Sequence, residues 1–255
     1  MKNVRVERRK NSGQVLVITS LVVVLLLLSS VVYVTETEKN APVYHPDANT
    51  DLSAIKQAAM HTVMSALVNI SNGGAHSVLG EDLSRLKFAV KDHSYLAMSD
   101  LEFEALTSAP YVDGVSVSWG TNGEGVSSIF VNFALNSSGL SSSYYSEYAV
   151  NVTSSISVAG YYTQLSESLR QVNLTCTVLN EGNPAQMENL AAYYEQDSPG
   201  GWSQPVLPVS INYGNGTYLI SFTTENTTQS YLPVSVHCID AREVSVWANV
   251  TCAQG

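Results

Sequence analysis

The five histidines are the residues best suited to acid–base chemistry or zinc binding, and their spacing argues against both roles. No two of them share the short spacing that brings metal ligands onto one helix face or one hairpin. The chain also contains no HExxH, P-loop, G-x-S-x-G or dinucleotide-binding motif. We therefore predict a non-enzymatic protein with no catalytic residue, no metal site and no cofactor. A Ser–His–Asp site dispersed along the chain would leave no such motif. The histidines are His45, His61, His76, His93 and His237.

Three cysteines fit neither a paired zinc motif nor a CxxC redox site. Each of them alternates with polar residues in a predicted strand, so all three side chains should point inward. Cys176 and Cys238 fall on strands expected in opposite sheets, and we predict a disulfide between them. Cys252 is a rival partner for Cys176. Three buried thiols without any bond are the other interpretation.

Seven Asn-x-Ser/Thr sequences predict N-glycosylation, against about three to four expected by chance from the composition. All seven follow the apolar segment described below, and those in predicted strands alternate with inward apolar residues, as a surface acceptor requires. The alternative is that outward polar residues match the motif by accident. The candidates are Asn69, Asn136, Asn151, Asn173, Asn215, Asn226 and Asn249.

An uncharged stretch of twenty residues, 15–34, is long enough as a helix to span the hydrocarbon core of about 30 Å. The net charge is +4 over the first 13 residues and −14 over the rest. This asymmetry places the N-terminus in the cytoplasm and the C-terminal part outside. We therefore predict a cytoplasmic segment over 1–13 and a transmembrane helix over 14–34 of a single-pass protein in the cell membrane. A cleaved secretory signal is the alternative, although residues 33–36 make a poor cleavage site. The acidic ectodomain argues against nucleic-acid binding.

The residues before this helix, Arg8-Arg9-Lys10-Asn11-Ser12-Gly13-Gln14-Val15-Leu16, resemble the class III signal of archaeal type IV pilin-like proteins. The resemblance covers about residues 1–34. It implies that a dedicated peptidase cuts between Gly13 and Gln14 and leaves the apolar helix on the mature chain. It also implies contacts with other pilin-like or envelope subunits.

The ectodomain pattern predicts a linker over 35–50, a small α+β domain over 51–155 and an immunoglobulin-like β-sandwich over 156–255. Helical spacing of apolar residues indicates one helix from about Asp51 to Asn72 and a second from Ser77 to about His93. Alternating patterns then indicate strands that form an antiparallel meander and, after it, the sandwich. These strands are expected at 115–119, 129–135, 148–158, 172–178, 190–194, 218–222, 234–238 and 244–250.

These features favour a membrane-anchored cell-surface protein with a structural or adhesive role in the envelope. A surface module or receptor that binds a solute or a glycan is the alternative from another class, and an anchored hydrolase is a third. Exposed, contiguous tyrosines at 161–162 or 193–194 would favour glycan binding, and buried ones the structural role. The lipid bilayer is the partner that the sequence indicates most directly.

Overall fold

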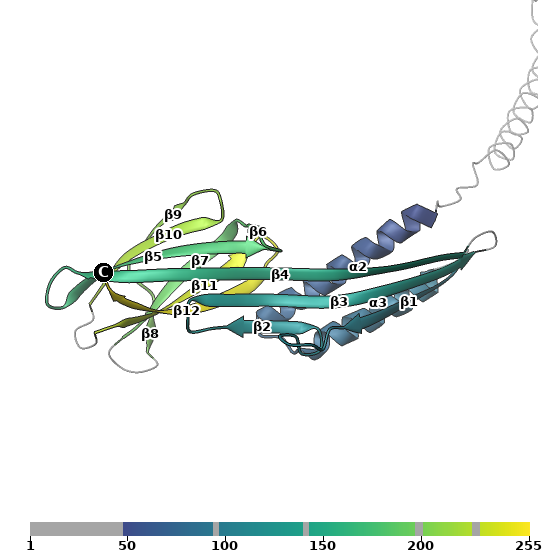
Figure 1. Cartoon of the computed structure of the whole chain (residues 1–255), viewed down its shortest axis with the longest axis horizontal. Helices are drawn as coiled ribbons and strands as arrows, with labels where there is room; N and C mark the ends of the chain where they lie inside the picture. Colours follow the sequence, from purple (N-terminus) through teal and green to yellow (C-terminus); the bar gives the residue numbers. More distant parts are fainter. Residues whose placement is uncertain (1–47, 94–96, 140–142, 197–200, 226–229) are drawn as a thin grey trace, which may run out of the picture. The chain divides into compact units, whose positions relative to one another are not determined.

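The computed structural model describes residues 48–93, 97–139, 143–196, 201–225 and 230–255. Residues 52–255 form one compact unit with an α+β architecture, two helices and a large, mostly antiparallel set of strands (Figure 1). The processing site at Gly13 and Gln14 and the predicted membrane segment lie outside the described residues. Within the described ranges, no helix combines the length and apolar character needed to cross a membrane.

Apolar residues repeating every three to four positions explain both helices. Helix α2 spans Ala48–Ser71 and α3 spans Ser77–His93. The chain leaves α2 where Gly73 takes a φ of 98°, a left-handed conformation that glycine tolerates without strain. The buried faces carry Ala59, Val63, Ala66, Leu67 and Ile70 on α2 and Leu79, Leu83 and Val90 on α3.

Long antiparallel strands form the sheet that these helices cover. They are β1 (Ala97–Ala105), β2 (Val115–Trp119), β3 (Glu124–Gly139) and β4 (Ser143–Gln164). β3 lies between β1 and β4 and also pairs with β2. One row across the sheet consists of Phe103, Phe133 and Tyr148, with the last two rings stacked at 5.3 Å between centroids. Lys56 of α2 places its Nζ 5.0 Å from the centre of the Tyr148 ring. We call α2, α3 and this part of the sheet the helix-covered region.

The C-terminal strands form two ladders, which we call the paired ladders. The first runs β4-β5-β10-β9, with the short β6 beside β5, and the second runs β8-β7-β11-β12. β12 meets β4 in parallel where Ala253 pairs with Tyr161 and Gln254 with Tyr162, which joins the ladders at one edge. The new bounds are β5 Leu169–Asn180, β6 Asn183–Pro184, β7 Met187–Glu195, β8 Trp202–Ser203, β9 Val209–Asn212, β10 Thr217–Glu225, β11 Leu232–Asp240 and β12 Ser245–Gln254.

Side chains from the two ladders contact one another. The rings of Tyr194 on β7 and Phe222 on β10 stack with their centroids 6.0 Å apart. The backbone N–H of Met187 donates to the Tyr218 hydroxyl at 2.8 Å. β5 and β10 show the strict alternation of buried and less buried residues that a strand with one face in a core requires. Buried apolar residues of both ladders and both helices belong to one hydrophobic core.

The described elements match most of the helices and strands predicted from the sequence. α3 has the predicted bounds, and every expected strand lies within an observed one, except that β12 begins at Ser245, one residue after the predicted start. Several strands extend further than predicted, above all β4, which runs through residues 155 and 156 without interruption. The two predicted domains therefore share a strand, and the boundary at 155/156 stays a prediction. β1 and β9 were not identified as strands from the sequence.

Candidate functional site

Aromatic rings gather on the outward face of the β7-β11-β12 ladder. Trp247 on β12 stands at their centre, 4.1 Å between ring centroids from His237, 5.6 Å from Tyr193 and 6.3 Å from Trp119. We call Trp119, Tyr193, His237 and Trp247 the aromatic strip. Trp119 is 40% exposed, and the other three rings are half-buried. The strip is thus a partly exposed aromatic surface to which β7, β11, β12 and the end of β2 each contribute one ring.

The local sequence explains how these rings meet. Trp247 alternates with the buried Val246 and Ala248, so strand geometry turns it outward, and His237 is its direct cross-strand neighbour. The turn between β2 and β3 lies against β12 and brings Trp119 beside Trp247. This approach depends on Gly125, because a Cβ there would lie 2.0 Å from the Trp247 carbonyl oxygen. The turn between β2 and β3 therefore has a packing role.

The polar groups of the strip have partners within it. His237 Nε2 lies 2.7 Å from Ser245 Oγ, and burial lowers the pKa of the imidazole, which keeps the ring neutral at pH 7. The Tyr193 hydroxyl accepts a hydrogen bond from Gln204 Nε2 at 3.0 Å. A neutral surface of ring faces with hydroxyl and amide groups at its margin suits an amphipathic ligand such as a sugar, whose C–H groups pack on aromatic rings.

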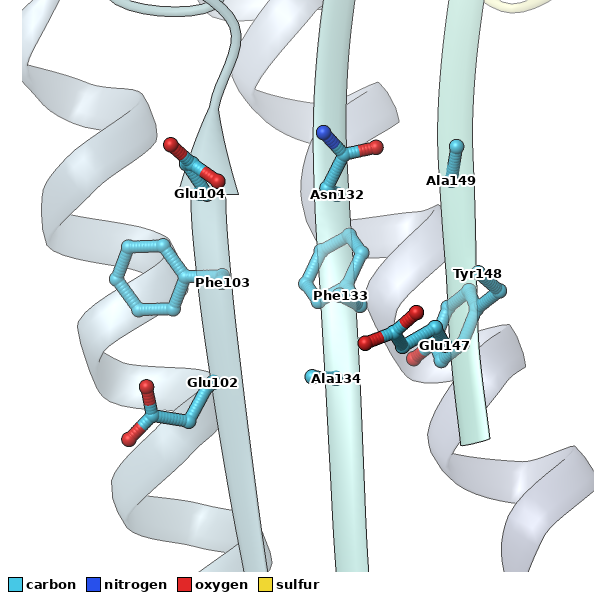
Figure 2. Close-up of a pocket in the computed structure, with 9 residues that line it drawn as sticks. All are labelled: Glu102, Phe103, Glu104, Asn132, Phe133, Ala134, Glu147, Tyr148 and Ala149. Carbon is cyan, nitrogen blue, oxygen red and sulfur yellow. The ribbon is translucent and has the colours of Figure 1, made fainter. Parts of the chain in front are cut away.

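A hollow with a volume of about 540 Å³ lies on the outward face of β1, β3 and β4. Figure 2 shows Glu102, Glu104 and Glu147 around Asn132 and Ala134, in rows that alternate with the aromatic row of the same strands. Among the described residues, no group of histidine, cysteine and carboxylate side chains is arranged to hold a metal ion. We interpret this acidic face as a solvated surface, in which Lys87 pairs with Glu102 at 3.4 Å.

The paired ladders contain a buried ionic network around Asp240, whose side chain is 1% exposed. Burial alone would raise the pKa of this carboxyl, but hydrogen bonds from Ser154 and the Val244 N–H and the charge of Arg242 lower it. Arg242 continues the network to Glu181 at 2.6 Å. Strands β4, β5 and the β11–β12 hairpin are thereby fixed to one another. The donors to Asp240, at 2.7–3.0 Å, are Ser154 Oγ, Asn180 Nδ2, Arg242 N, Arg242 Nε and Val244 N.

The predicted inward direction of the three cysteines is confirmed, since Cys176, Cys238 and Cys252 are all fully buried. All three are free thiols in this structure, and burial raises the pKa of each to about 12. Cys176 on β5 and Cys238 on β11 lie in opposite ladders, and the Cys176 charge also raises the pKa of Cys238. The disulfide between them stays a prediction.

The described glycosylation candidates all have at least partly exposed side chains. Asn173 accepts a hydrogen bond from Ser221 Oγ at 2.9 Å, and Asn151 accepts one from Thr153 Oγ1 at 3.1 Å. Asn226 lies outside the described residues. Glycosylation therefore stays a prediction. Asn69, Asn136, Asn151 and Asn215 are exposed, and Asn173 and Asn249 are half-buried.

The two tyrosine pairs singled out in the sequence are each split between the two faces of a strand. Tyr161 is 51% exposed, whereas Tyr162 is buried and its hydroxyl donates to the Ser230 carbonyl at 2.9 Å. Tyr194 packs toward Phe222 in the core, and Tyr193 joins the aromatic strip. Neither pair forms a contiguous exposed surface, as alternation along a strand requires.

Sequence reasoning missed the aromatic strip because its members are far apart in the chain. The sequence does contain one local signal, Trp247-x-Asn249-x-Thr251, which places a tryptophan and a glycosylation candidate on the same face of one strand. No family model, no curated protein and no solved structure matches this chain.

Proposed function

We propose that this chain is a non-enzymatic, membrane-anchored, pilin-like cell-surface protein with a structural or adhesive role in the envelope. In this proposal residues 14–34 form the transmembrane helix and the described unit stands outside the membrane. The charge asymmetry around the apolar segment and the accessibility of the described glycosylation candidates support this location. The paired ladders, with alternating burial and side-chain contacts across the core, support an immunoglobulin-like sandwich as their finer architecture.

The observation that carries the structural role is the exposed apolar edge at β9. This strand pairs with β10 along one side and ends the ladder, and no strand of the described residues pairs with its other side. Natural proteins usually protect such an edge with charge, because it templates pairing with another chain. Here the edge lacks charge and exposes large apolar side chains, which suits contact with a neighbouring envelope subunit. The exposed residues are Val206, Leu207, Val209, Ile211 and Tyr213.

Two measurements test this proposal separately. Protease added to intact cells should degrade the described unit, and full protection would contradict the outward location. Chemical crosslinking on intact cells should capture the protein in adducts that Ile211→Lys reduces several-fold, since a buried lysine opposes edge pairing. Phe88→Lys, at an exposed site on α3, is the matched control and should leave the adducts unchanged. Equal crosslinking of the wild type and Ile211→Lys would contradict the role of β9.

The aromatic strip favours a second function, binding of a glycan by a surface module. Its rings come from separate elements and lie next to one another on one surface. Neither of the two tyrosine pairs forms such a surface. Binding of soluble oligosaccharides to the ectodomain, followed by tryptophan fluorescence, tests this function. A Trp119→Ala variant that still binds equally would argue against the strip as the site.

A further inference from the structure

Asn249 lies beside the aromatic strip. It shares the outward face of β12 with Trp247, two residues earlier. On one side Asn249 pairs with Ser235, whose partner on β7 is Tyr193. On the other side the Asn249 backbone N–H donates to the Gly120 carbonyl at 3.0 Å, directly after Trp119. The register therefore surrounds this one asparagine with three of the four rings.

The other glycosylation candidates have different surroundings. The residue two positions earlier, which shares a face with the asparagine in a strand, is not aromatic at Asn69, Asn136, Asn151, Asn173 or Asn226. Asn215 follows Tyr213, but it lies in a turn in which its Oδ1 accepts the Thr217 N–H at 3.1 Å. In the strand register, Asn136 pairs with Tyr145, Asn151 with Phe130 and Asn173 with Tyr161, so each of them has one aromatic cross-strand neighbour. Asn249 differs because residues next to it in the strand and the register bring three rings of the aromatic strip around it.

We propose that the aromatic strip is the packing surface for an N-linked glycan on Asn249, with the first pyranose ring lying against Trp119 and Trp247. This inference rests on the proposed outward location. One face of a pyranose carries C–H groups, which pack on aromatic rings while the hydroxyl groups stay in water. Trp119 is 40% exposed and so has ring surface left to cover. The glycan would cover the apolar ring surface that the protein chain alone leaves exposed to solvent.

The glycosylation machinery of the cell carries out the covalent attachment of the sugar. Asn249 Nδ2 attacks the anomeric carbon of a lipid-phosphate-linked sugar, and an N-glycosidic bond forms. The bond from that carbon to the phosphate oxygen breaks, the lipid phosphate leaves, and the amide loses one proton. The exposed Thr251 completes the acceptor sequence without a packing role of its own. This makes Thr251→Ala a suitable way to remove the glycan while Asn249 stays in place.

The test is a double-mutant cycle on the protein purified from its native host. Thr251→Ala and Trp119→Ala should each lower the Tm by about 2–4 °C, the shift that about 1 kcal/mol produces in a domain of this size. The double variant should lose no more than the larger single loss, because both changes remove one contact. In protein made without glycosylation, Thr251→Ala should have no effect. Thr217→Ala, which removes the acceptor sequence of Asn215, is the matched control and should show additivity with Trp119→Ala.

Glycopeptide mass spectrometry distinguishes a failure of this inference from a failure of the proposed function. An unoccupied Asn249 beside occupied acceptors elsewhere would overturn this inference and leave the outward location intact. An absence of glycan from every acceptor would count against the inference and against the glycoprotein character of the proposed function. Additive losses with Asn249 occupied would overturn packing on the strip. Loss of soluble oligosaccharide binding in unglycosylated Trp119→Ala would instead assign the strip to an external ligand and contradict the inference.

Discussion

The helix-covered region and the paired ladders are held together by different interactions. In the first, apolar faces of α2 and α3 bury side chains against long strands, and the ion pairs lie at the surface. In the second, Asp240 and Arg242 form an ionic network between strands that are distant in the chain. Apolar packing tolerates many sequences, whereas a buried charge requires every partner to be in place. The comparison predicts that the two regions respond differently to single substitutions and to pH.

Asp240→Asn should have the largest effect. It removes the buried one of the two carboxylates that pair with Arg242, and breaking a buried pair typically costs about 3–5 kcal/mol. Because the folded pKa of Asp240 lies below its ordinary value, this stabilisation is present above the ordinary value and is lost as the pH falls through the folded pKa. Denaturant unfolding measures the loss, with the exposed Glu102→Gln as a control that should cost at most about 1 kcal/mol. Equal losses for the two variants would remove the contrast between the regions.

Leu67→Ala tests the apolar side of the comparison. Leu67 is fully buried on α2, and truncation of such a residue costs about 2–5 kcal/mol. The loss should not change with pH, since no charge is involved. Met60→Ala, at a position on the same helix that is 43% exposed, should cost less than about 0.5 kcal/mol. A pH-dependent loss for Leu67→Ala would mean that the apolar core and the ionic network are coupled.

The Cys176–Cys238 disulfide would add about 2–4 kcal/mol to the paired ladders by restricting the unfolded chain. Peptide mapping without reduction should find these two cysteines linked, and a reducing agent should lower the free energy of unfolding by that amount. A Cys176–Cys252 link, or three free thiols in the protein from its native host, would contradict the pairing.

His237 should give the smallest effect. Burial lowers its folded pKa, so the unfolded chain takes up a proton first as the pH falls below about 6.5. Stability should therefore decrease as the pH falls below about 6.5, and His237→Gln should remove this decrease. The exposed His61→Gln is the control and should leave it unchanged. An unchanged pH profile in His237→Gln would show that the imidazole is not the group that titrates.

Periodicity predicted the elements because helices and half-buried strands repeat their burial within a few residues. It located α3 and the cores of β5, β10, β11 and β12, and the inward cysteines followed from the same parity. The Asp240 network and the aromatic strip escaped prediction, since they depend on the pairing of strands far apart in the chain. Ser154 and Asp240, 86 residues apart, share one hydrogen bond, and nothing local signals it. β9 was missed although its sequence alternates apolar and polar residues, because the run is only four residues long and lies between Pro208 and the turn that begins at Tyr213.

Cysteine labelling on intact cells tests the outward location most directly. The three native thiols are fully buried, with pKa values raised to about 12, so the wild type should react little with a membrane-impermeant maleimide. Thr223→Cys adds one thiol at an exposed position on β10, outside every glycosylation acceptor. We predict that intact and permeabilised cells label this variant equally. Labelling that appears only after permeabilisation would place the described unit inside the cell and contradict the account.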